Sequence, residues 1–152
     1  MEILIPGLIL VGLMYWASTK IKQKAADAYK DEVVETDKFR VEKPDGFISP
    51  ALPEDGLEFA AYSKEFGRDR TRDLRQAELE VRSRPEVPAE HTSAEDANDV
   101  LEVPSSNSDL AEFVRFVKAD EGVYELRGRV LVEHRQEFAR KLKEMMASFA
   151  VK

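Results

Sequence analysis

The chain begins with an uninterrupted run of hydrophobic side chains. Residues 3–17 read ILIPGLILVGLMYWA and hold no charge. As a helix this run spans about 22 Å, and extension to Ile21 gives about 28 Å, close to the roughly 30 Å hydrocarbon core of a bilayer. A helix that is hydrophobic on all sides lies either in a membrane or in a protein core. The terminal position favours the membrane, so we predict a single transmembrane anchor over residues 1–21.

The residues that end this run indicate how it lies in the bilayer. Tyr15 and Trp16 stand where the aromatic belt of a membrane helix is expected, and Lys20, Lys22 and Lys24 follow at once. Lysine side chains reach the lipid phosphates, and the flank that is richer in lysine faces the cytoplasm. We therefore predict these five residues as the membrane-anchoring set, in a cell (inner) membrane, with the soluble part in the cytoplasm.

Two other interpretations of this segment are a cleaved signal peptide and a buried core helix. Signal peptides have a basic start, an apolar centre and small residues before the cleavage point. Here the start carries Glu2, bulky aromatic residues precede Ala17, and positive charge follows the apolar run. Each of these features opposes cleavage, which leaves the anchor as the prediction.

Alternating patterns predict the strands of a soluble domain. Residues 38–43, 75–82 and 123–132 alternate between apolar and polar side chains, as half-buried strands do. Residues 113–118 fit a helix or a strand equally well. The short turn at residues 120–122 decides for a strand, because two strands joined by a glycine-containing turn make a hairpin.

Helical spacing of apolar side chains occurs in two segments of the domain. Residues 55–66 carry a stripe that ends at Gly67, a plausible helix stop. Residues 133–149 carry a longer stripe, formed by Phe138, Leu142, Met145, Met146 and Phe149. Between them, the polar and proline-containing residues 83–108 predict a long mobile loop, with a short helix near residues 93–101.

The predicted fold class is α+β. The transmembrane anchor over residues 1–21 is followed by a juxtamembrane stalk over residues 22–35, into which the helix continues through Tyr29. The soluble domain then covers residues 36–152, with a small sheet of about four mainly antiparallel strands packed by a C-terminal helix.

The layout of the domain resembles that of PsbP-like and DcrB-like α+β domains. These often begin with a Pro-x-Gly turn followed by an aromatic residue and close on a helix that ends in Ser-Phe; the matching positions are Pro44, Gly46, Phe47, Ser148 and Phe149. The resemblance implies a non-catalytic accessory role, since these families mostly act as extrinsic binding or assembly subunits. It also favours the far side of the membrane, whereas the lysines favour the cytoplasm, and we expect the cytoplasm.

Composition narrows the classes of function. There is no cysteine, which excludes disulfides, thiolate zinc sites and cysteine nucleophiles. Residues 25–152 hold 20 basic and 29 acidic side chains, a net charge of −9. Such a domain is repelled by anionic lipid and is a poor general binder of nucleic acid. The charge therefore favours a protein partner and no nucleic acid.

Candidate catalytic or metal-binding groups are few. His91 lies in the polar loop. His134 and Glu137 are three residues apart on a predicted helix and can share one metal face, but zinc sites need three or four ligands and the chain offers no second half-site. Residues 105–108 are a serine-rich linker. We predict no catalytic residue, no cofactor and no metal.

One basic cluster lies outside the stalk. Residues 67–75 read GRDRTRDLR, with arginines at 68, 70, 72 and 75 and aspartates at 69 and 73. RNA or phosphate contact is one interpretation, and a salt-bridged surface the other. We expect the salt-bridged surface.

These observations predict a membrane-anchored, non-catalytic binding or assembly module. The alternatives are a membrane-tethered enzyme with carboxylate-based chemistry and an envelope-facing accessory protein. Neither the partner nor the oligomeric state follows from the residues.

Overall fold

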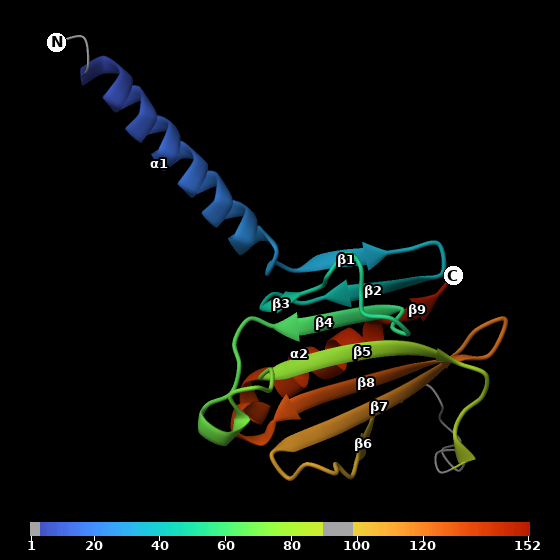
Figure 1. Ribbon diagram of the computed structural model, residues 1–152. Coiled ribbons are helices and arrows are strands. Elements are labelled where there is room, and N and C mark those ends of the chain that lie inside the picture. The colour runs from blue at the N-terminus through green and yellow to red at the C-terminus, as the bar shows by residue number, and fades with distance from the viewer. Residues whose placement is uncertain (1–3, 90–98) are drawn as a thin grey trace.

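The computed structural model describes residues 4–89 and 99–152 of the chain (Figure 1). One long helix, α1 (Leu4–Asp27), extends away from a domain in which α2 (Arg135–Ser148) packs on β-sheet. The α+β class predicted from the sequence is confirmed. The strands are β1 (Glu32–Glu35), β2 (Phe39–Lys43), β3 (Phe47–Ile48), β4 (Phe59–Ser63), β5 (Ala77–Arg84), β6 (Leu101–Val103), β7 (Leu110–Lys118), β8 (Val123–Leu131) and β9 (Ala150–Val151).

The described strands form two sheets, not the single sheet of about four strands that we predicted. The larger has six strands in the order β3-β4-β5-β8-β7-β6, and the smaller has three in the order β1-β2-β9. All the pairings are antiparallel. The predicted number was too low for two reasons. β3, β6 and β9 hold only two or three residues each, too few to show a period, and β1 and β4 lie in segments predicted as stalk and helix.

The core lies between α2 and one face of the six-stranded sheet. Figure 1 shows α2 running behind β5 and β8. The apolar stripe predicted for the last helix is buried there, and so are Ala77, Leu79 and Val81 of β5, which the alternation had placed on one face. Gly128 of β8 lies directly under the helix, since a Cβ atom there would come within 2.9 Å of Leu142 Cδ2.

The β7–β8 hairpin is confirmed. Its strands pair from Leu110↔Leu131 to Lys118↔Val123. In the turn, Gly122 has φ +83°, a left-handed conformation that suits glycine. A Cβ atom there would also lie 2.3 Å from the Arg84 carbonyl oxygen. The turn therefore requires glycine on two counts.

The helix predicted over residues 55–66 is wrong. Residues 59–63 form β4, and four of its five residues are buried. Phe59 and Ala61 pair with Val81 and Leu79 and lie on the face that α2 covers. Ala60 points to the opposite face and is buried as well. A strand covered on both faces loses its alternation, and its apolar residues then resemble a helical stripe.

Two predicted boundaries also need correction. The stalk predicted over residues 22–35 is helical only to Asp27, and residues 32–35 form β1. A turn in which Phe39 N–H donates to Thr36 Oγ1 (3.1 Å) closes the β1–β2 hairpin, so the domain begins before residue 36.

The predicted loop over residues 83–108 is interrupted at both ends, by β5 reaching Arg84 and by β6 pairing with β7. Residues 90–98 lie outside the described residues. His91 and most of the short helix predicted near residues 93–101 fall there.

In the part of the chain that the structure describes, no helix combines the length and the apolarity of a membrane span.

Candidate membrane helix and surface sites

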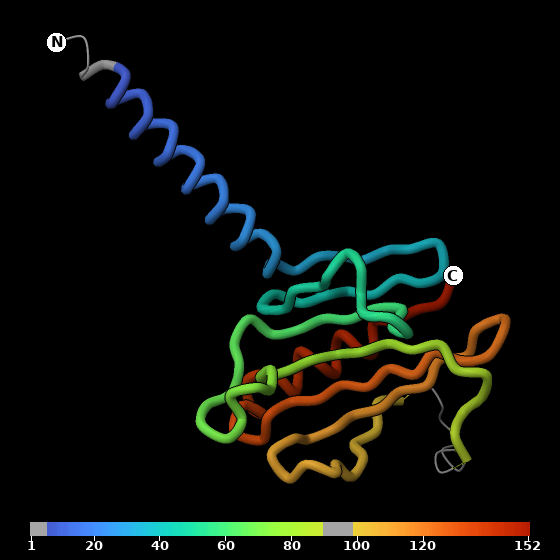
Figure 2. Tube along the Cα trace, in the orientation of Figure 1, coloured from blue at the N-terminus to red at the C-terminus, as the bar shows by residue number. Residues whose placement is uncertain are grey.

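Residues 6–17 of α1 present apolar side chains in every direction, whereas residues 18–27 include three lysines and an aspartate. The Cα trace of this helix stands clear of the domain (Figure 2), and all its side chains from residue 6 to residue 27 are exposed. Tyr15 is 77% exposed and Trp16 62%. Within the described chain, no element packs on the apolar residues 6–17 of this helix.

The predicted membrane-anchoring residues lie together at the domain end of this apolar surface. Lys20 Nζ lies 5.6 Å from the centre of the Trp16 ring, within cation–π range. Lys20 and Lys24 are four residues apart and share one side of the helix, whereas Lys22 projects from the other. The three ammonium groups therefore surround the helix just beyond its aromatic residues.

A buried lysine fixes the joint between α1 and the domain. Lys43, at the end of β2, is 1% exposed. Its Nζ donates to the carbonyl oxygens of Lys30 (2.6 Å) and Phe47 (2.6 Å) and lies 3.5 Å from that of Ala28. The carbonyls just beyond the C-terminus of a helix lack partners within the helix and attract a cation. Lys43 thus binds the chain where it leaves α1.

Further contacts complete this joint. Gly46 N–H donates to the Tyr29 carbonyl oxygen at 2.7 Å, and Lys64 Nζ lies 5.8 Å from the centre of the Tyr29 ring. Burial lowers the pKa of the Lys43 ammonium, and nearby Glu32 and Asp31 oppose that shift. The joint lies outside the predicted anchoring set. The alternation of residues 38–43 does place Lys43 on the buried face, with Phe39 and Val41, and that signal could have marked it as buried.

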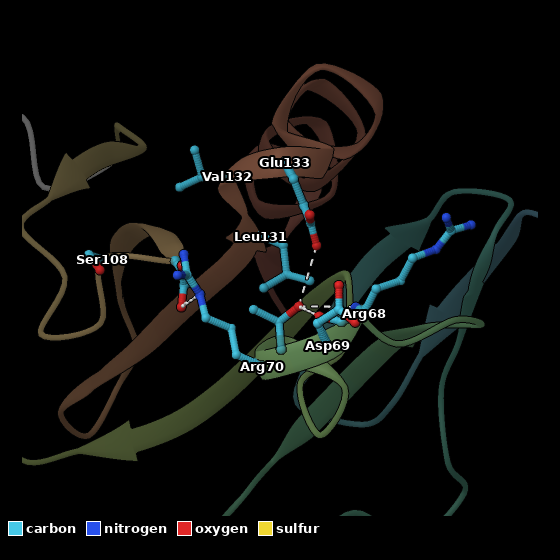
Figure 3. Close-up of a pocket in the computed structure, with 9 residues that line it drawn as sticks. Arg68, Asp69, Arg70, Ser108, Leu131, Val132 and Glu133 are labelled. Carbon is cyan, nitrogen blue, oxygen red and sulfur yellow. Dashed lines mark hydrogen bonds and ion pairs between the residues drawn. The ribbon is translucent and has the colours of Figure 1, made fainter.

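A cavity of about 510 Å³ lies at one end of the large sheet, lined by the basic cluster of residues 68–71 and by Asp109 and Glu133 (Figure 3). Arg70 donates from Nε and Nη2 to the two Asp109 carboxylate oxygens, at 3.1 and 2.5 Å. The Thr71 hydroxyl lies 3.3 Å from a Glu133 carboxylate oxygen. Figure 3 shows the Arg68 side chain directed away from Glu133 and the cavity. The donors of this cluster do not converge on one point.

The arginines at 70 and 75 are engaged within the domain. The Arg75 guanidinium lies 4.2 Å from the centre of the Phe66 ring, and Nη1 donates to the Ser63 carbonyl oxygen at 2.9 Å. Arg70 is bound by Asp109. These two contacts agree with a salt-bridged and stacked surface, the interpretation that we favoured for residues 67–75.

The Arg70–Asp109 pair is exposed enough that its contribution to stability is small. The Arg70 side chain is 81% exposed, and solvent screens an ion pair at such a position. We expect Asp109→Asn to leave the midpoint of urea denaturation nearly unchanged. A clearly lower midpoint would show that the pair, and not the backbone, holds residues 68–72 in place.

The remaining candidate groups also have local partners. His134 Nδ1 lies 3.6 Å from Glu137 Oε2 and His134 Nε2 lies 3.8 Å from Glu133 Oε1. Within residues 4–89 and 99–152, no three potential metal-ligating side chains lie close enough to hold an ion. In the serine-rich segment, Ser105 Oγ accepts from Asn107 N–H at 3.1 Å and contacts Glu112 Oε1 at 3.3 Å. That hydroxyl stabilises a turn.

A network of alternating charges covers the face of the large sheet opposite α2. Glu125 and Glu112 are buried (3% and 8% exposed) and accept from arginines on β5 and β8. Arg84 Nε lies 2.6 Å from Glu125, and Arg127 bridges Glu125 (3.2 Å) and Glu112 (3.0 Å). Arg129 bonds to Glu78 at 3.0 Å. A general acid needs a carboxylate held neutral by an apolar setting, and these carboxylates are instead each bound to arginine.

No protein-family model matches the chain, and no curated protein matches it. The resemblance to PsbP-like and DcrB-like domains therefore stays a likeness of layout.

Proposed function

We propose that this protein is a membrane-anchored, non-catalytic binding or assembly module, whose α+β domain contacts another protein at the cytoplasmic face. The observation that carries the proposal is the exposure of α1, which stands clear of the domain and is apolar on all sides over residues 6–17. The sequence of residues 3–17 holds no charge. A lipid bilayer covers such a surface more completely than a single groove does.

The joint supports a position of the domain close to the membrane. Four residues separate the end of α1 at Asp27 from the start of β1 at Glu32, and Lys43 and Gly46 hydrogen-bond to that short connection. A domain held this near a bilayer meets partners in or on the same membrane. The orientation of the proposal rests on Lys20, Lys22 and Lys24, which favour the cytoplasmic side.

The non-catalytic part of the proposal rests on how the candidate groups are used. The buried carboxylates are bound by arginines, His134 contacts glutamates of its own helical segment, and the Ser105 hydroxyl holds a turn. The exposed side chains outside these contacts are better suited to recognising a partner than to bond-breaking chemistry.

Charged substitutions in α1 test the anchor. Each arginine at the centre of a membrane helix costs about 2.5–3.5 kcal/mol of insertion free energy. We expect Leu10→Arg with Leu13→Arg to move most of the protein from the membrane pellet to the soluble fraction after alkaline extraction. The matched control is Val33→Arg with Val132→Arg, which places the same charges on exposed positions of the domain and should leave the protein in the pellet.

Two outcomes would contradict parts of the proposal. A wild-type chain that stays in the alkaline supernatant would exclude the anchor. A reporter fused after Lys152 that is active only outside the cytoplasm would reverse the orientation and favour the envelope-facing alternative.

A further inference from the structure

The connection between α1 and the domain is short, and residues of the domain hold its backbone. Four residues, 28–31, separate Asp27 from Glu32. A flexible link of four residues would sample end-to-end distances on the order of 10 Å and would let the domain swivel about the end of the helix. Here the carbonyl groups of three consecutive residues, 28, 29 and 30, each face a donor from the domain.

The donors come from the chain segment that ends β2 and turns into β3. Lys43 Nζ donates to the Lys30 carbonyl oxygen at 2.6 Å and lies 3.5 Å from that of Ala28. Gly46 N–H donates to the Tyr29 carbonyl oxygen at 2.7 Å. Lys43 is buried, and hydrogen bonds in a protein interior are stronger than those at a wet surface. A link held at three successive residues cannot rotate without breaking these contacts.

The same three residues also continue the hydrogen bonding of α1. The N–H groups of residues 28, 29 and 30 donate to carbonyl oxygens in the last turn of the helix, at 3.1–3.2 Å. Each residue therefore contacts the helix through its N–H and the domain through its C=O. The link is an ordered extension of α1 that is bound to the domain along its length.

The segment that holds the link is itself fixed to the core. Phe47 is buried and packs edge-on against Phe138 of α2, with the ring centres 5.8 Å apart. Lys141 of α2 donates from Nζ to the carbonyl oxygen and to a carboxylate oxygen of Asp45, at 3.2 and 3.1 Å. The link is thus bound to a part of the domain that packs on α2, and not to a free loop.

We propose that α1 and the domain form one rigid unit, in which Lys43 and Gly46 fix the direction in which α1 leaves the domain. The consequence of this inference rests on the proposed function: with α1 in a bilayer, the orientation of the domain to the membrane is fixed as well. α1 joins the domain beside the small sheet, and β6 lies at the opposite side of the domain (Figure 1). A membrane-bound partner then always meets the same side of the domain.

Distances between pairs of spin labels test this rigidity, and the absence of cysteine lets each label be placed at one introduced cysteine. Gln23→Cys on α1 with Gln136→Cys on α2 spans the joint, and both positions are exposed. Gln136→Cys with Lys118→Cys lies within the domain and gives the width of a rigid pair. For the full chain in zwitterionic lipid nanodiscs, we expect distance distributions of similar width. A swivelling link would broaden the first by on the order of 10 Å.

Two insertions of Gly-Ser-Gly-Ser distinguish a hydrogen-bonded joint from a link that is merely short. Between Asp31 and Glu32, the insertion lengthens the chain beyond the bound carbonyls, so the distribution across the joint should keep its width. Between Asp27 and Ala28, it separates α1 from the bound residues, so the distribution should broaden by on the order of 10 Å. Lys43→Met should broaden it too, and the pair within the domain reports in each variant whether the domain is folded.

The inference is overturned if the wild-type distribution across the joint is broad, if the two insertions broaden it equally, or if Lys43→Met leaves it unchanged in a folded domain. Retention of the chain in the nanodisc, measured in the same samples, tests the anchor separately. A retained chain with a broad distribution rejects the rigid joint alone. A chain that leaves the disc but keeps the narrow distribution rejects the anchor alone.

Discussion

Replacing Gly128 with valine is expected to lower the free energy of unfolding by about 3 kcal/mol. Gly128 lies between Leu79 and Phe113 on neighbouring strands, under the point where α2 crosses the sheet. A Cβ atom would come within 2.9 Å of both Leu142 Cδ2 and Met146 Sδ, and both of those residues are fully buried. A branched side chain would therefore lift the helix from the sheet and open the core on both sides.

The comparison that tests this reason is Gly12→Val. It makes the same chemical change on α1, where a new Cβ atom meets nothing within 4 Å, so the unfolding of the domain should be unaffected. Gly128→Ala should cost less than Gly128→Val, because the atoms it meets are the ends of flexible side chains. Chemical denaturation of the full chain in detergent, followed by near-ultraviolet circular dichroism, measures all three. An unchanged midpoint for Gly128→Val would show that α2 does not approach the sheet this closely.

Replacing Lys43 with methionine is expected to cost about 3 kcal/mol of unfolding free energy. Methionine keeps most of the side-chain volume but removes the ammonium that donates to the Lys30 and Phe47 carbonyl oxygens and lies near that of Ala28. Buried carbonyls that lose a charged donor lose more than the ordinary hydrogen-bond contribution. The joint should also loosen, with faster hydrogen exchange at Gly46, whose N–H bonds to Tyr29.

Lys38→Met serves as the control for this prediction. Lys38 lies on the same hairpin, but its side chain is 58% exposed and its ion pair with Glu58 is long, at 3.8 Å. Its replacement should change stability by less than about 0.5 kcal/mol. Equal losses for the two variants would mean that net charge, and not the buried hydrogen bonds, explains the Lys43 effect.

The carbonyl groups at the end of α2 are held by a cation in the same way. Arg115, on β7, donates from Nη1 to the carbonyl oxygens of Met146 (2.6 Å) and Phe149 (3.0 Å). Burial lowers the pKa of Arg115, as it does that of Lys43. In both cases a strand residue distant in sequence supplies the charge that a helix terminus attracts.

The sequence by itself determined the elements whose signals are local. The alternation of residues 75–82, the glycine-containing turn at residue 122 and the apolar stripe of residues 133–149 predict β5, the β7–β8 hairpin and α2, because side-chain period depends only on the geometry of a single element. The sequence also located an apolar N-terminal segment followed by lysines. These strands and this helix were enough to predict the α+β fold class.

Only the tertiary structure decided what distant residues do together. β4 was mistaken for a helix because other parts of the chain cover its second face. The residues of β4 alone give no sign that both faces are buried. Lys43 became a hydrogen-bonded buried cation through packing with residues 28–30 and Phe47, and Arg115 binds the end of α2, 31 to 34 residues away. Burial and charge at a surface are sums over many chain segments, so they exist only once those segments have come together.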